Sequence, residues 1–311
     1  MALSFMTVSV DSFLTQWASF HSLLGAFARG EPRLVADGLW GSARALVASA
    51  LLGETGRPAL VLVSGLTELH RVSRDLAFFD HALGFGLSRT VGFPPAQPAF
   101  WRVGRHAEVE AERAVVCHRL LRGEPLTVVT TPAALAPALL PPEEFRARTF
   151  RLAAGERVDR TVLLERVQTA GYERVETVVE VGQWSLRGGI VDIFSPVRRE
   201  PVRIEFFGDE VESLRAFDPT TQRSVETVAS FDVIPLAGKV EPGATIFDYL
   251  PASAPVVLDD PALLEAPPDD APSPVPLAEL TAGRQQIRLG LLAATPPDPD
   301  AGRFTLETRS I

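Results

Sequence analysis

The residues that could bind a phosphate lie in a glycine-containing loop before a predicted apolar helix, in the run Gly38-Leu-Trp-Gly41-Ser-Ala-Arg-Ala45. A working phosphate loop reads GxxxxGK[ST]: glycine N–H groups surround the phosphates, the lysine reaches the β and γ oxygens, and the hydroxyl holds Mg²⁺. Here Gly38 keeps the first glycine, but Ala43 replaces the second, Arg44 replaces the lysine and Ala45 removes the hydroxyl. We therefore expect no ATP hydrolysis at this loop, and an ordinary glycine-serine helix start explains the same residues.

A second group of residues suits binding rather than catalysis. Arg187 stands before two glycines that mark a kink or bulge in a predicted strand, so its planar guanidinium can project towards carboxylates. Arg174 and Phe194 flank it in the sequence, and arginine and aromatic side chains are enriched among the residues that dominate binding energies. If the three share one exposed sheet face, they form an arginine–aromatic patch that favours an acidic partner and loses affinity with salt.

These residues also have structural interpretations. Arg187 could form a surface salt bridge with Glu180 or Glu205, which would contribute little to stability. Phe194 could be an ordinary core residue. Asp192 and Glu205 could pair as carboxylates, but alternation along strands favours exposed or structural roles for them.

No other residues have the spacing of a metal site or a catalytic centre. The single cysteine, Cys117, excludes a disulfide framework and a zinc ribbon, and the five histidines are scattered without HExxH spacing. Cys117 and His118 are neighbours on a predicted helix, where successive side chains point about 100° apart, so they cannot face each other. The sequence therefore predicts no metal, no cofactor and no catalytic residue.

Strands and helices must alternate to position these residues. Residues 59–63 form a continuous apolar run typical of a buried parallel strand, and residues 127–131, Thr-Val-Val-Thr-Thr, are predicted to be the next buried strand. Helices are predicted at 46–52, at 67–79 with Thr67 as its N-cap, and at 106–121. This alternation predicts an α/β fold with a parallel sheet covered on both faces.

The pattern changes near Pro137. A helix is predicted at 158–170, and residues 178–194 and 201–217 alternate like antiparallel strands, with a hairpin turn at 207–210. A strand at 256–258 precedes an acidic, proline-rich loop at 266–276. The middle of the chain is therefore predicted to be an α+β module.

Composition limits the function classes. The 311 residues, 46% of them hydrophobic, suffice for two or three modest cores. The net charge of −9 disfavours tight, sequence-independent binding of nucleic acid. No apolar run reaches the roughly 20 residues of a membrane span, and residues 1–27 read as an amphipathic helix without a basic n-region. We expect a cytoplasmic protein that does not bind a membrane.

Several segments together resemble two bacterial DNA-repair families, the excinuclease subunit UvrB and the transcription-repair coupling factor. Those similar to domain 2 of both families are residues 171–176, 181–194, 201–215 and 217–224. Those similar to domain 1A are residues 58–63, 93–95 and 128–135. The degenerate loop, the short tyrosine-poor stretch between Phe93 and Val128, and the form of residues 188–194 favour the coupling factor family over UvrB.

The resemblance implies a degenerate P-loop-type parallel-sheet domain 1A at residues 1–136. Domain 2 is then an inserted α+β module at 137–222, and domain 1B a second small α/β lobe at 223–311. Coupling factors continue into a polymerase-interacting domain and a translocase motor. We therefore expect this sequence to be the N-terminal UvrB-like region of a longer protein.

The resemblance also implies a function, which is to bind UvrA through domain 2 and so recruit excision repair to stalled RNA polymerase. Arg174, Arg187 and Phe194 match family positions at the UvrA contact, whereas Ser185 stands where UvrB has a further arginine, so that contact should be weaker. RNA polymerase and double-stranded DNA would be partners of the remaining domains, with little or no DNA binding here and no enzyme activity.

Two alternatives stay open at this point. The chain could be a UvrB-like ATP-dependent DNA helicase subunit of the excinuclease, which Mg²⁺-dependent ATP turnover would reveal. It could also be a DNA-binding module without a protein partner, which tight duplex binding at physiological salt would reveal.

Overall fold

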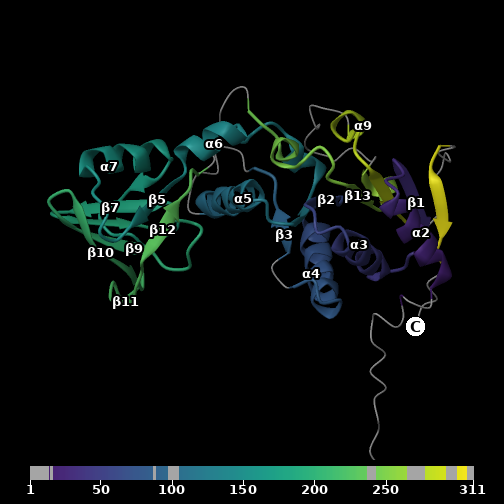
Figure 1. Ribbon diagram of the computed structural model, residues 1–311, viewed down its shortest axis with the longest axis horizontal. Coiled ribbons are helices and arrows are strands. Elements are labelled where there is room, and N and C mark those ends of the chain that lie inside the picture. Colours follow the sequence, from purple (N-terminus) through teal and green to yellow (C-terminus); the bar gives the residue numbers. More distant parts are fainter. Residues whose placement is uncertain are drawn as a thin grey trace, which may run out of the picture. The chain divides into compact units, whose positions relative to one another are not determined.

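A computed structural model describes residues 14, 17–86, 89–96, 105–236, 243–264, 277–291 and 300–306 (Figure 1). The chain forms two compact units. Unit 1 comprises Met1–Pro95, Gly123–Ala136 and Leu250–Ile311, and unit 2 comprises Ala96–Arg122 and Pro137–Tyr249. The predicted acidic loop at 266–276 and most of residues 1–16 lie outside the described residues. No helix in the described ranges is long and apolar enough to cross a membrane.

Unit 1 is built on a seven-stranded sheet in the order β15-β1-β14-β13-β2-β4-β3, in which every neighbouring pair is parallel. The strands are β1 (Arg33–Asp37), β2 (Ala59–Leu62), β3 (Thr90–Phe93), β4 (Thr127–Thr130), β13 (Val256–Asp259), β14 (Gln286–Leu289) and β15 (Gly302–Thr305). The helices are α2 (Ala18–Ala28), α3 (Ala43–Gly53), α4 (Leu66–Ala82), α8 (Pro261–Leu264), α9 (Leu277–Leu280) and the 3₁₀ turn η2 (Pro132–Leu135). The predicted α/β class is confirmed.

The main core of unit 1 lies between this sheet and helices α2, α3 and α4. Leu23 of α2, Leu51 of α3 and Leu76 of α4 are fully buried in one cluster with Val61 and Val257 of the sheet. Because side chains alternate along a strand, the neighbours Leu258 and Arg288 point to the opposite face. That second face therefore carries a different set of residues.

The helix and strand predictions that fall on the described residues of unit 1 are confirmed, apart from one cap. The predicted strand at 59–63 is β2, and the predicted helices at 46–52 and 67–79 are α3 and α4. However, α4 begins at Leu66, and its N-cap is Gly65, in extended conformation and without a side-chain hydrogen bond. Thr67 therefore lies inside the helix, and the capping prediction is wrong by two residues.

The last third of the chain differs from the predicted separate lobe at 223–311. Strands β13, β14 and β15 join the large sheet, where Val257 pairs with Val61 and Ile287 pairs with Leu34. The reason is burial: all four residues of β13 are buried, so this strand needs neighbours on both sides. Residues 223–236 belong instead to unit 2.

Unit 2 contains a six-stranded sheet in the order β11-β10-β9-β8-β7-β6 and a two-stranded sheet of β12 and β5. The strands are β5 (Phe150–Ala153), β6 (Glu173–Arg174), β7 (Gln183–Arg187), β8 (Ile190–Ile193), β9 (Val202–Phe207), β10 (Glu210–Phe217), β11 (Ser224–Thr227) and β12 (Ser230–Val233). The helices are α5 (Arg105–Leu121), α6 (Pro142–Arg148), α7 (Arg160–Thr169) and the 3₁₀ turn η3 (Ile246–Tyr249). The predicted helices at 106–121 and 158–170 are α5 and α7.

Helix α7 covers one face of the six-stranded sheet. The Asp159 carboxylate caps the helix by accepting hydrogen bonds from the backbone N–H groups of Thr161 and Val162. Leu163 and Val167 of α7 pack with Trp184, Ile204 and Leu214 in one buried cluster. The residues that alternate with these strand positions therefore lie on the face that α7 does not cover.

Two glycine turns connect the central strands. Gly188, at φ +60°, and Gly189 form the two-residue connection from β7 to β8, so these glycines make a hairpin turn rather than the predicted kink or bulge. The predicted hairpin at 207–210 is confirmed, with Gly208 at φ +62°. The register irregularity lies instead in β10, between Val211 and Ser213.

Two helical glycines of unit 1 should respond oppositely to alanine. A Cβ on Gly53 would lie 2.0 Å from the Phe85 ring, so Gly53→Ala should lower the free energy of unfolding by about 1–3 kcal/mol. A Cβ on Gly25 would meet only the flexible end of Arg29, so Gly25→Ala should raise stability by up to about 1 kcal/mol. Urea denaturation of both variants measures the change in the free energy of unfolding. Changes of the same sign in the two variants would contradict this packing.

Candidate partner-binding surface

An ion-pair cluster around Asp192 organises the sheet face that α7 leaves uncovered. The carboxylate of Asp192, in β8, is fully buried. Arg203 donates to both of its oxygens, from Nε at 2.8 Å and from Nη2 at 2.9 Å. Arg187 donates to the same carboxylate from Nη2 at 2.9 Å. A buried carboxylate is costly unless it is paired, and here two guanidiniums pair it.

The two arginines of this cluster differ in exposure. Arg203 lies 4.5 Å above the Phe217 ring with a side chain only 17% exposed, and its hydrogen bonds to Asp192 raise its pKa despite burial. The side chain of Arg187 is 50% exposed. Arg203 therefore holds the cluster together, whereas Arg187 presents positive charge at the surface.

Arg174, in the edge strand β6, pairs with Trp184 of β7 and so lies on the side of the sheet that α7 covers, opposite to Arg187. The Arg174 guanidinium lies 5.4 Å from the centre of the buried Trp184 ring, within range of a cation–π interaction. A hollow of about 600 Å³ lies beside it, lined by Arg174, Val175, Glu176, Thr177, Leu186 and Arg187. The two arginines that the sequence singled out therefore line one hollow at the edge of the sheet, but the expectation that they share one sheet face is wrong.

Phe194, the third predicted surface residue, belongs to the core. It is 6% exposed and packs with Val178 and Phe217, because residues preceding β7 cover this end of the sheet face. The predicted arginine–aromatic patch therefore lacks this aromatic. Its interpretation as an ordinary core residue is the correct one.

The partner of Arg187 also differs from both candidates. It pairs with Asp192 rather than with Glu180 or Glu205. Glu205 accepts a hydrogen bond from the Ser213 hydroxyl at 2.6 Å and lies 3.6 Å from Arg215. Register explains the geometry of the cluster, since Asp192 pairs with Ser185 on one side and with Arg203 on the other.

Sequence reasoning missed three features of this face. Arg203 was not recognised as an anchor, and Asp192 was not recognised as its centre. Phe207, at the tip of the β9–β10 hairpin, is 78% exposed. Strand alternation puts Arg203 and Phe207 on one face of β9. It could not show that this is also the face of Asp192, because that requires the order and register of the strands. Ser185 is buried, so this position presents no polar group at the surface.

The arginine of the degenerate phosphate loop forms ion pairs with two aspartates. Gly38 and Gly41 have φ values of +84° and +53°, and Ala43 begins α3. Arg44, which replaces the lysine, pairs through Nε with Asp259 at 2.8 Å and through Nη1 with Asp260 at 3.0 Å.

The two aspartates stand at the end of β13, next to the loop. Burial raises the pKa of Asp259 to about 6, opposed by the charges of Arg44 and Arg71. Arg71 of α4 adds a longer contact to Asp259 at 3.8 Å. Ala45 is buried and has no hydroxyl to offer a metal ion, and the described residues contain no group of three His, Cys, Asp or Glu side chains arranged to hold one.

This chain is similar to known DNA-repair proteins. Residues 150–237 match the model of the UvrB interaction domain. The chain is 31% identical over 230 residues to the transcription-repair-coupling factor of Bacillus subtilis, and 34% identical over 210 residues to that of Myxococcus xanthus. It is 28% identical over 233 residues to UvrABC system protein B of Thermus thermophilus.

The fold and the matched residues define a UvrB-like α/β region with a UvrB interaction domain, which the cluster around Asp192 lies within. More particularly, the chain belongs to the N-terminal UvrB-like region of transcription-repair-coupling factors. The matches cover 73% and 67% of this chain but only 19% and 18% of those two relatives. The match to UvrABC system protein B covers 71% of this chain and 34% of that protein.

In unit 2, Phe194 is a core residue and Phe207 is a surface residue, so the two should respond differently to alanine. Phe194→Ala should lower the free energy of unfolding by about 3–5 kcal/mol, because it leaves a cavity beside Phe217. Phe207→Ala removes a ring that is 78% exposed and should change stability by less than about 0.5 kcal/mol. Chemical denaturation of both variants measures the difference, and similar losses would place Phe194 outside the core.

The Arg44 cluster should give a pH-dependent stability change. The pKa of Asp259 is raised in the folded protein, so the stability that its protonated form contributes is complete below about pH 4 and is lost as the pH rises through about 6. Arg44→Ala removes an opposing charge and should raise this pKa further. The variant should therefore unfold more easily by about 3 kcal/mol at pH 8, and this deficit should shrink as the pH falls through the variant's higher pKa towards 6.

Denaturation of Arg44→Ala and the unchanged chain at several pH values measures this deficit. Arg74→Ala is the control, because its side chain is 77% exposed, and it should differ from the unchanged chain by less than about 0.5 kcal/mol at every pH. A deficit of equal size at pH 5 and pH 8 would contradict the assignment to Asp259.

Proposed function

We propose that this chain is an adaptor that binds UvrA through the surface formed by Arg174 and Arg187. The observation that supports it best is that both arginines line one hollow within the matched UvrB interaction domain. Arg187 is held by a buried carboxylate and Arg174 by a buried indole, so each loses little freedom on binding. The partner surface should be acidic, because it meets two guanidiniums.

In this proposal the region works by recruitment and not by catalysis. Arg44, which replaces the lysine of a phosphate loop, is held in ion pairs with two aspartates, and Ala45 offers Mg²⁺ no hydroxyl, which supports the absence of ATP hydrolysis here. By analogy with the coupling factors, the longer protein would contact RNA polymerase and double-stranded DNA through other domains, in the cytoplasm. UvrA bound to this region would then be brought to a stalled polymerase.

The proposal predicts a loss of UvrA affinity when either arginine is removed. Arg187→Ala and Arg174→Ala should each weaken binding by more than about 1 kcal/mol, or roughly fivefold in Kd. Isothermal titration calorimetry of the chain with purified UvrA measures this change. Circular dichroism and thermal unfolding show whether each variant is folded.

Arg151→Ala is the matched control, because Arg151 lies in β5 of the same unit, outside the hollow, with a side chain that is 68% exposed. Its affinity should equal that of the unchanged chain. UvrA binding that survives both Arg174→Ala and Arg187→Ala would remove this surface from the proposal. Mg²⁺-dependent ATP turnover by the chain would favour the helicase alternative.

A further inference from the structure

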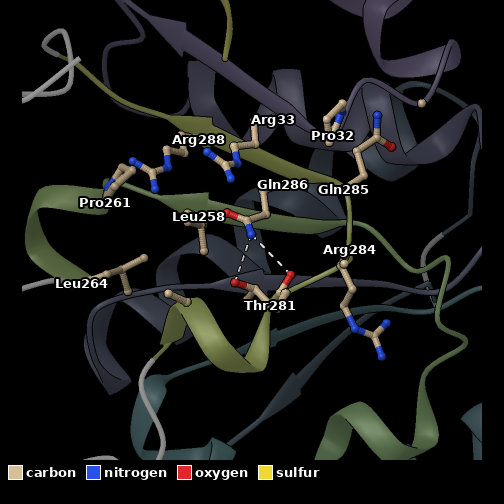
Figure 2. Close-up of a pocket in the computed structure, with 14 residues that line it drawn as sticks. Pro32, Arg33, Leu258, Pro261, Leu264, Thr281, Arg284, Gln285, Gln286 and Arg288 are labelled. Carbon is tan, nitrogen blue, oxygen red and sulfur yellow. Dashed lines mark hydrogen bonds between the residues drawn. The ribbon is translucent and has the colours of Figure 1, made fainter. Parts of the chain in front are cut away.

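Unit 1 contains a cavity of about 790 Å³ on the sheet face opposite its main core (Figure 2). Strands β1, β13 and β14 contribute Arg33, Leu258, Gln286 and Arg288 to its wall. Register puts these side chains on one face, since Arg33 pairs with Gln286 and Arg288 pairs with Leu258. The volume is within the range of about 300–1,000 Å³ that is usual for small-molecule sites.

The charge of this cavity contrasts with that of the chain. Three of its fourteen lining residues are arginines, and none of these fourteen is Asp or Glu, although the whole chain carries a net charge of −9. Figure 2 shows Arg33 and Arg288 extending in the same direction from neighbouring strands, with their guanidiniums near each other. Two adjacent guanidinium forks are a good match for the oxygens of one phosphate.

The rest of the wall suits an organic group. Leu258 is buried in β13, and Pro261 and Leu264 of α8 continue the apolar surface beside it. Gln286 is fixed by its own hydrogen bonds, because its Nε2 donates to the backbone oxygen and the hydroxyl of Thr281 at 3.3 and 3.1 Å. The cavity thus combines a cationic end with an apolar wall.

We propose that this cavity binds a phosphate ester of nucleotide size. Arg33 and Arg288 hold its phosphate, and its organic part lies against Leu258, Pro261 and Leu264. The site is distinct from the degenerate phosphate loop. Asp259, which pairs with Arg44 of that loop, alternates with Leu258 and so lies on the core side of the sheet, whereas Leu258, Gln286 and Arg288 line the cavity on the other side.

The phosphate could belong to a free ester or to the backbone of a nucleic acid. The concave shape and the acidic chain favour the free ester, because a backbone binder normally presents an extended basic surface. The test therefore uses three probes: adenosine 5′-monophosphate, inorganic phosphate and a short single-stranded DNA.

Titration calorimetry of the whole 311-residue chain measures the binding of each probe. Adenosine 5′-monophosphate should bind more tightly than inorganic phosphate, because only the nucleotide uses the apolar wall. Arg288→Glu should weaken nucleotide binding at least about tenfold. Arg33→Glu should also weaken nucleotide binding. Because Arg33 is exposed, this variant keeps the test valid if Arg288→Glu does not fold.

Arg74→Glu is the matched control, since it makes the same charge change at an exposed position outside the cavity and should leave binding unchanged. Arg174→Ala should also leave it unchanged, so failure here is separate from failure of UvrA binding. Binding of the DNA but not of the nucleotide, weakened by Arg288→Glu, would overturn the proposal of a free ester and assign these arginines to a nucleic-acid backbone. The proposal would be overturned if no probe bound. It would also be overturned if Arg288→Glu and Arg33→Glu both bound the nucleotide as tightly as the unchanged chain does.

Discussion

The pairing of one buried carboxylate, that of Asp192, is the constraint on which the binding face of unit 2 depends. A fully buried charge must be compensated, and Arg203 does so with a two-oxygen fork from the adjacent strand. That geometry requires β8 and β9 in their observed register and directs Arg203 over Phe217. The second oxygen also accepts from Arg187, which fixes a surface guanidinium at the edge of the hollow. If this surface binds UvrA as proposed, stability and binding share one interaction.

In unit 1 a buried carboxylate, that of Asp259, is also paired with an arginine. The loop between β1 and α3 keeps Gly38 and Gly41 in left-handed conformations, yet Arg44 reaches two aspartates at the end of β13. The arginine that replaces the phosphate-loop lysine is therefore held by ion pairs within the protein. The ion pairs join α3 to the central strand β13, so a fold of P-loop type keeps this connection without a ligand.

The sequence predicted local structure well because apolar periodicity is local information. Helix α3, strand β2 and the hairpin at 207–210 followed from spacing and turn residues alone. The burial of Phe194 could not be predicted in this way, because Val178 and Phe217, which pack against it, lie far from it in the sequence. Nor could the position of β13, since strand order in a parallel sheet is set by long-range pairing. Arg187 was recognised, but its partner Asp192 required the register of the hairpin.

The central claim is that Asp192 acts on partner binding by positioning Arg187. A double-mutant cycle of Asp192→Asn and Arg187→Ala, measured as UvrA affinity by calorimetry, tests it most directly. The account predicts that Asp192→Asn weakens binding in the unchanged chain but adds little when Arg187 is already alanine, with a coupling energy of about 1 kcal/mol or more. Effects that add to within about 0.5 kcal/mol would contradict it.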